Sequence, residues 1–289
     1  MGDKTAAFCM FHELSRSSEG AWGEAARARL AGRAFDGFVS TNQSPVDPVR
    51  PASSNVVYRY NNKRPLRNEG GWPAEMENAC VRSIRMEYDG PGWDDGMDDT
   101  SRADRNFLDV FHELTGFKVA TKSESHKISL LRKYPKGYVP PFVYMTGTNT
   151  INVSSNDVKV MREYLLGGGL LFASAGSPQW GPSFKSFIGQ VFPGQSLLVI
   201  ADDDPLFQVP FTFPNGAPPL WHHSGTRVLG IKHNGRWVVY FHPGGIHNAW
   251  KTGHSGMDPV LAEDATRIGI NVIYYAFTNY LEETRGYRQ

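Results

Sequence analysis

The stretch that decides the fold is FVYMTGTNTINVSSNDVKVMREYLLGGGLLFASAG, residues 142–176. It begins with a continuous apolar run at Phe142–Gly147 and ends with a second one at Gly169–Gly176. Between them, apolar residues recur at three- and four-residue steps, Ser154 or Ser155 suits a helix N-cap, and glycines end the helix. Two strands that are apolar on both faces, joined by a helix, are typical of a parallel sheet covered on both sides.

The same alternation of strands and helices continues on both sides of this stretch. We expect strands at 80–88, 117–121 and 196–204, helices at 103–116, 126–134 and 183–194, and a long helix opened by Asp258 and Pro259. This order predicts an α/β fold with a flavodoxin-like, doubly wound, mostly parallel sheet. Ligands of such folds bind beyond the carboxyl ends of the strands, a rule that locates a crevice without naming a reaction.

A C-terminal β-hairpin is predicted within the histidine-rich segment Trp221–Trp250. Its turn is Asn234-Gly235, a strong two-residue hairpin signal. The predicted pairs are His233 with Arg236, Ile231 with Val238, Leu229 with Tyr240, and Arg227 with His242. His233 then lies at the tip of the hairpin, and His242 lies at the opposite end.

Residues 1–78 are interpreted as an irregular N-terminal arm, and residues 79–289 as the α/β domain. The segment Ala21–Phe35 is rich in Ala and Arg and predicts one short helix. The passage after it carries three closely spaced prolines, which favour an extended, loop-like chain. Two interpretations stay open: a disordered or surface-hugging arm, and an arm that docks on a partner subunit.

The composition excludes some classes of partner. The 289 residues carry 30 basic and 29 acidic side chains, so no basic excess favours nucleic acid or anionic lipid. No apolar run approaches the roughly 18–20 residues of a membrane span. Because the N-terminus lacks the pattern of a secretion signal, we expect a cytoplasmic protein, or a periplasmic one if a signal peptide has been removed.

Several motifs together resemble one bacterial family. They are the opening stretch, IRMEYDGPGWDD (84–95), FPGQSLLVIADDDPLF (192–207), FHPGGIHNAW (241–250) and RIGINVIYYAFTNY (267–280). The family is the domain of unknown function numbered four-one-five-nine, and the resemblance covers roughly Val81 to Leu281. The resemblance implies a fold similar to class I glutamine amidotransferase-like domains, and it implies no established activity.

The chain departs from that family at three strand ends. Asp203-Asp204-Pro205 stands where the family often has Asp-His-Pro, and ASAGSP stands where acidic residues are common. His242 is retained, but Pro243, Gly244 and Gly245 replace the acidic and amide residues usual after it. If those residues form a site in the family, this chain has altered or lost it.

Three familiar chemistries do not fit the sequence. Glutamine hydrolysis needs a cysteine on a tight strand-to-helix turn, whereas Cys9 and Cys80 precede or start the first core strand. Ser174 is preceded by Phe172, where a nucleophile elbow needs a small residue. Gly167–Gly169 follows a helix and precedes a strand, so it caps the helix instead of cradling phosphate.

The remaining candidates are histidines and acidic strand ends. His242 with Asp203 or Asp204 offers acid/base chemistry, because Asp202–Asp204 ends a predicted strand on the expected ligand side. His222, His223 and His247 approach the same end of the hairpin and offer imidazole ligands to a transition metal, with no compact ligand pair in support. An acidic loop provides a weaker candidate for a hard cation through Asp94, Asp95, Asp98 and Asp99.

The sequence favours a binding subunit without amidotransferase activity. Its α/β domain is expected to bind a ligand or protein partner, and its arm to dock on a partner or on a second copy. One alternative is a His/Asp hydrolase, with or without a metal. The other is a purely structural subunit of an assembly.

Overall fold

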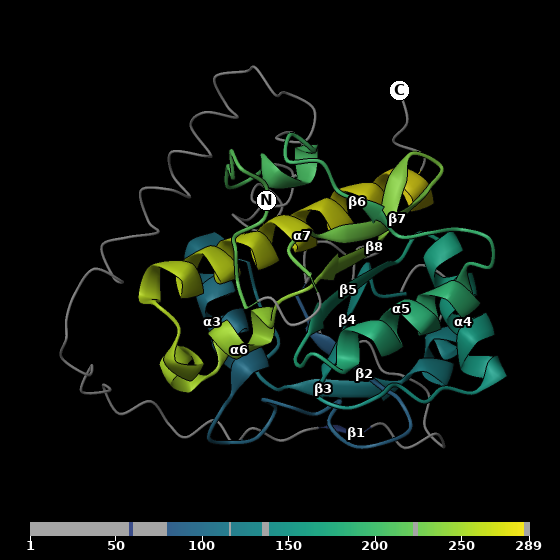
Figure 1. Ribbon diagram of the computed structural model, residues 1–289, viewed down its shortest axis with the longest axis horizontal. Helices are drawn as coiled ribbons and strands as arrows, with labels where there is room; N and C mark the ends of the chain where they lie inside the picture. The colour runs from purple at the N-terminus through teal and green to yellow at the C-terminus, as the bar shows by residue number, and fades with distance from the viewer. Residues whose placement is uncertain (1–57, 60–79, 116, 135–138, 222–224, 286–289) are drawn as a thin grey trace, which may run out of the picture.

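A mostly parallel sheet forms the centre of the computed structural model, which describes residues 58–59, 80–115, 117–134, 139–221 and 225–285 (Figure 1). The order across the sheet is β1-β3-β2-β4-β5-β8-β7-β6. The strands are β1 (Tyr58–Arg59), β2 (Ile84–Glu87), β3 (Glu124–Lys127), β4 (Phe142–Gly147), β5 (Leu170–Ala175), β6 (Leu198–Val199), β7 (Leu229–His233) and β8 (Arg236–His242).

The strands from β1 to β8 in this order run parallel, whereas β7 and β6 add antiparallel pairs at one edge. The chain passes from β2 outward to β3 and then returns across β2 to β4. The direction of winding therefore reverses between β2 and β4. At this point the loops that follow the two strands diverge, and the carboxyl edge of the sheet offers room for other groups.

Helices cover both faces of the sheet. One layer holds α3 (Ala103–Thr115), α6 (Ile246–Trp250) and α7 (Pro259–Arg285), which contact one another (Figure 1). The other layer holds the 3-10 helix η2 (Ile128–Lys133), α4 (Ser155–Leu166) and α5 (Trp180–Val191), and α4 contacts both neighbours. Short 3-10 turns, η3 (Pro205–Phe207) and η4 (Thr252–Gly256), lie in the connections.

The deciding stretch folds as its pattern predicts. β4 and β5 are buried at every position and pair in parallel, with Phe142 opposite Leu170. Ser154 is the N-cap of α4: its hydroxyl accepts the Asp157 N–H, and the Asp157 carboxylate accepts the Ser154 N–H. This reciprocal capping box decides between the two serines.

One predicted strand lies elsewhere in the chain, and another is shorter than predicted. The strand predicted at 117–121 is wrong, because there Val119 forms only an isolated bridge with Val81, and the strand lies at Glu124–Lys127. The sequence of β3 is polar, and its buried Ser125 donates to Glu87 Oε1 across the sheet at 2.8 Å. The strand expected at 196–204 is reduced to Leu198–Val199, a half-exposed pair at the sheet edge.

The hairpin forms at Asn234-Gly235, but its predicted register holds only at the turn. His233 pairs with Arg236 as expected. A bulge between Ile231 and Lys232 then shifts the register by one residue, so the predicted pairs farther along are wrong. The observed pairs are Ile231 with Val239, Gly230 with Tyr240, and Leu229 with Phe241.

Within the described ranges, no helix combines the length and the apolar character needed to cross a bilayer.

Candidate functional site

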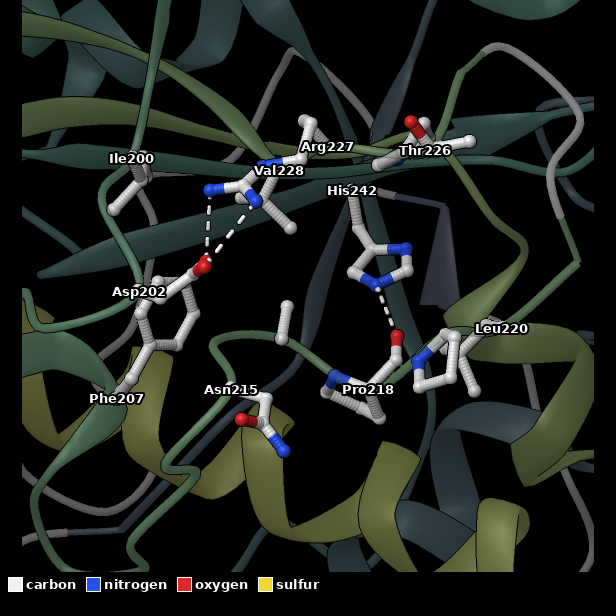
Figure 2. Close-up of a pocket in the computed structure, with 13 residues that line it drawn as sticks. Ile200, Asp202, Phe207, Asn215, Pro218, Leu220, Thr226, Arg227, Val228 and His242 are labelled. Carbon is white, nitrogen blue, oxygen red and sulfur yellow. Dashed lines mark hydrogen bonds and ion pairs between the residues drawn. The ribbon is translucent and has the colours of Figure 1, made fainter.

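A small polar cavity lies at the carboxyl end of β8. It encloses ≈ 50 Å³ between β8, the connection after β6 and the segment before β7 (Figure 2). His242 forms one wall, and Asp202 with Arg227 forms another. Asn215 and Pro218 border the cavity between them. The sheet edge predicted to hold a site therefore does carry polar groups that face one space.

The His242 ring is buried and bonded at both nitrogens. Nδ1 lies 3.0 Å from the Gly244 N–H, and Nε2 lies 3.3 Å from the Pro218 carbonyl oxygen (Figure 2). A neutral ring with the proton on Nε2 satisfies both backbone groups, because Nδ1 then accepts from Gly244 and Nε2–H donates to Pro218. The opposite tautomer could donate from Nδ1 to the Gly244 carbonyl oxygen, 3.2 Å away, but it would lose the Gly244 N–H and place an unprotonated Nε2 against the Pro218 carbonyl oxygen. The geometry thus uses His242 to hold two loops together.

Asp202 and Arg227 form a two-pronged ion pair at the cavity mouth. The guanidinium nitrogens of Arg227 lie 2.8 and 3.2 Å from the two carboxylate oxygens of Asp202. Gly216, at φ +72°, packs against that carboxylate so closely that a Cβ there would lie 2.3 Å from Oδ1. Both charged side chains stay nearly half exposed, at 48% and 44%. They can therefore meet a group arriving from solvent.

The acidic residues predicted from the sequence lie outside this lining. Asp203 is exposed. The Asp204 carboxylate accepts the Leu206 N–H at 3.0 Å and the Trp237 indole N–H at 2.9 Å, so it caps η3 and holds β8. Of the three consecutive aspartates, Asp202 is the one that lines the cavity with His242. The run Asp202–Asp204 indicates the end of the strand, but no periodicity in the sequence shows which of the three side chains points into the cavity.

His247 belongs to a second polar cluster, on α6. Its Nε2 lies 2.7 Å from Asp95 Oδ2, and its Nδ1 lies 3.1 Å from the Thr146 hydroxyl at the end of β4. Lys251 Nζ lies 2.9 Å from both carboxylate oxygens of Asp95. The Thr146 hydroxyl also lies 2.7 Å from the Ser174 carbonyl oxygen, which is its alternative acceptor. Asp95 therefore ties the loop after β2 to α6, and His247 ties α6 to β4.

Burial sets the proton affinities in this cluster. Burial of the His247 imidazole lowers its pKa from 6.5 to about 4, although the hydrogen bond to Asp95 opposes the shift. Burial opposes ionisation of Asp95, but the hydrogen bonds from His247 and Lys251 and the positive charge of Lys251 outweigh it and lower its pKa. At neutral pH the carboxylate is therefore ionised, and the imidazole is neutral.

The sequence did not reveal the Asp95–His247 pair. The spacing of Asp94, Asp95, Asp98 and Asp99 predicts only a weak cation loop, whereas Asp95 turns inward to His247 and Lys251. Asp98 instead accepts the N–H groups of Thr100 and Ser101, closing a local turn. The pair joins positions 152 residues apart, so no local spacing could indicate it.

The predicted metal ligands are not brought together by the part of the chain that the structure describes. His247 is bonded to Asp95 and Thr146, and His222 and His223 lie outside the described residues. Among the described residues, no three His, Cys, Asp or Glu side chains gather in a group able to hold a metal ion. The predicted metal set stays a prediction.

A comparison with models of known protein families identifies the family of this chain. Residues 82–277 match the family described as "Domain of unknown function (DUF4159)". The chain belongs to this family. The match runs from the residues just before β2 into α7, so it includes both polar clusters. No curated protein matches the sequence.

The low pKa of His247 predicts how this DUF4159 domain responds to acid. Between pH 6.5 and about 4 the unfolded chain binds a proton that the folded domain excludes, so lowering the pH through this window favours unfolding. The loss is on the order of 3 kcal/mol. His247→Gln is expected to cost about 1–3 kcal/mol at pH 7 through lost buried hydrogen bonds, and to flatten this part of the profile. Urea unfolding at pH 7, 5.5 and 4.5 measures both effects.

His233→Gln at the hairpin tip is the matched control and should keep the wild-type profile. His126, whose pKa burial also lowers, to about 3, is present in all three proteins and contributes the same background. An unchanged pH profile in His247→Gln would show that the buried imidazole is not the group responsible.

Proposed function

We propose that this chain is a binding subunit without amidotransferase activity. Its α/β domain binds a ligand or a protein partner at the carboxyl edge beside His242, and residues 1–78 dock on a protein partner or a second copy. The observation that carries the proposal is the bonding of two histidines at this edge: His242 and His247 each have hydrogen-bond partners at both ring nitrogens. The partners of His242 are backbone groups of two loops, so its ring holds these loops together. The partners of His247 are two side chains, Asp95 and Thr146.

The carboxylates support binding over hydrolysis. A His/Asp hydrolase needs an acid that orients the imidazole through its second nitrogen. The ring nitrogens of His242 face backbone groups and no carboxylate. The Asp204 carboxylate is bonded to Leu206 and Trp237 instead. His247 does have an acid partner in Asp95, but its ring is wholly buried, and the adjoining Thr146 is buried as well.

The proposal includes a flavodoxin-like, doubly wound fold similar to amidotransferase-like domains. After residue 80 the parallel strands lie in the order β3-β2-β4-β5-β8, which is second, first, third, fourth and fifth along the chain. Cys80 lies just before β2, and burial raises the pKa of its thiol, which makes it a poor nucleophile. Cys9 lies outside the described residues. The strand order supports an amidotransferase-like fold. The raised pKa of the Cys80 thiol supports the absence of amidotransferase chemistry.

The size of the His242 cavity suggests what enters it. A whole cofactor needs a pocket of several hundred Å³, roughly 300–1,000 Å³. A cavity of ≈ 50 Å³ admits one functional group. Arg227 and Asp202 at its mouth are rigidly paired but exposed, so they suit recognition of a polar or charged group on a larger partner.

Reversing the charge at the cavity mouth tests this binding site. In Arg227→Glu two carboxylates face each other, so a partner that uses the Asp202–Arg227 pair should bind about tenfold more weakly. Partners of the full chain are first captured and identified by mass spectrometry. Their affinities for wild type and variant are then measured by calorimetry.

Arg132→Glu is the matched control for this experiment. Arg132 forms an ion pair of similar length and exposure with Glu163, at 2.7 Å and 43% and 49% exposed. Arg132 lies in η2 and Glu163 lies in α4, and neither residue lines the His242 cavity. Equal affinity of both variants for every captured partner would contradict a binding site at this cavity.

Deleting residues 1–57 tests the arm. This deletion leaves Tyr58–Arg59 paired with β3, so the edge of the sheet stays covered. The shortened chain is expected to unfold at the wild-type urea concentration but to lose a partner or its oligomeric state. Size-exclusion chromatography with light scattering and repeat capture measure these losses. If the shortened chain keeps its assembly state and all partners, the arm has no docking role.

A further inference from the structure

The outer side of β6 is an open edge of the sheet. β6 is the last strand in the order across the sheet, and within the described residues it pairs with β7 alone (Figure 1). Leu198 and Val199 are 53% and 51% exposed, although neighbouring residues of a strand point to opposite faces. Both faces of the sheet are therefore open to solvent at this edge.

The sequence of this edge lacks the residues that commonly protect one. Residues 195–201 read QSLLVIA, with no charged residue and no proline. Charged side chains and prolines on an edge strand discourage pairing with another chain, whereas an uncharged apolar edge favours it. β6 is short, which limits the strength of such a contact. The edge therefore suits weak pairing with one further strand.

The backbone of β6 turns the hydrogen-bonding groups of Val199 outward. The Ile200 N–H donates to the Val228 carbonyl oxygen at 3.0 Å, toward β7. Because these groups alternate in direction along a strand, the N–H and C=O of Val199 point away from β7. A second β6 strand placed antiparallel to this edge exchanges two hydrogen bonds at Val199, with a twofold axis between the two valines. The same register places Leu198 of each copy opposite Ile200 of the other.

Exposed charges of opposite sign lie at the two ends of β6. Asp203, at one end, is exposed and has no ion pair within the described part of the chain. Lys232 of β7, at the other end, is also exposed and lies two residues beyond Gly230, which pairs with Leu198. Its ammonium group lies 4.8 Å from the centre of the Trp237 ring and has no acidic partner in the described ranges. An antiparallel pair of β6 strands therefore brings an acidic end to a basic end, twice by symmetry.

We propose that β6 pairs with β6 of a second copy of this chain, across a twofold axis at Val199. The pair joins the two sheets edge to edge and covers the exposed apolar side chains. A second copy is the partner that the edge selects, because antiparallel pairing of one sequence sets Asp203 of each copy at the same end as Lys232 of the other. The contact involves neither the His242 cavity nor residues 1–78.

Sedimentation velocity of the full chain over a dilution series measures this dimer. The contact between two short strands is small, so we expect a Kd on the order of 10 μM. Val199→Lys places like charges opposite each other at the axis and should weaken the dimer about tenfold or more. Val260→Lys is the matched control, at an apolar residue of α7 that is 66% exposed, and should leave the dimer unchanged.

Exchanging the two charges tests the antiparallel register. Asp203→Lys and Lys232→Asp each bring like charges together twice, and each should weaken the dimer about threefold to tenfold. The double variant restores opposite charges at both ends and should return to the wild-type Kd. A purely structural effect of either substitution would not be reversed by the other.

Hydrogen exchange at single amides locates the contact. The Val199 N–H should exchange more slowly at protein concentrations above the Kd than below it, because it becomes bonded only in the dimer. The Ile200 N–H is already bonded to Val228 and should exchange at the same rate at both concentrations.

Val199, Asp203 and Lys232 are exposed, so their variants keep the fold. A chain without residues 1–57 should keep the β6 dimer, which separates this contact from docking by the arm. A chain that stays monomeric throughout the dilution series, an unchanged Kd in Val199→Lys, or a double charge variant that associates no better than the single ones would each overturn the proposal.

Discussion

The buried guanidinium of Arg85 is the interaction on which the carboxyl edge depends. It is wholly inaccessible at β2 and forms a 2.8 Å ion pair with Asp104, at the start of α3. Its other terminal nitrogen donates to the carbonyl oxygens of Trp93 and Asp95, and the group lies over the ring of Tyr144 on β4. A buried charge without partners costs several kcal/mol, roughly 3–5 kcal/mol when one partner is removed. Correct folding therefore has to bring α3, β4 and the loop after β2 together around this one side chain.

The position of that loop determines what the edge can do. Because Arg85 holds the Asp95 backbone, the Asp95 side chain reaches His247 on α6 and Lys251 directly after it. Trp93 and Met97 from the same loop are buried beside it. The same loop also contacts the segment after β4, where the Thr148 N–H donates to the Gly92 carbonyl oxygen at 3.3 Å. The His242 cavity at β8 is a polar opening at the same edge of the described chain.

The parts of the fold that follow from local pattern were predictable. Continuous apolar runs predict β4 and β5. The serine at the start of α4 and the glycines after it predict where this helix begins and ends. Apolar periodicity could not predict β3, because its buried residues Ser125 and His126 are polar and are held by hydrogen bonds. The bulge at Ile231 and Lys232 has no signal in the sequence, so the hairpin register could not be derived from its turn alone.

The sequence predicts which edge of the sheet carries polar groups, but it does not predict which residues line the cavity there. His242 and the acidic end of the β6 connection were both placed at the same edge, and the cavity there contains His242 with Asp202. The contacts that decide its chemistry join distant residues, such as His242 with Pro218 and Trp237 with Asp204. Tertiary packing sets these contacts, and a single sequence does not encode them as spacing.

The two edge imidazoles, His242 and His247, each hold chain segments together through both ring nitrogens. Two-bond ¹H–¹⁵N correlation spectra of the full chain at pH 7 test it directly, because they distinguish the two ring tautomers and the imidazolium. We expect His242 and His247 each to show a single, static form with the proton on Nε2. A rapidly exchanging mixture of tautomers, or a protonated ring at either position, would contradict it.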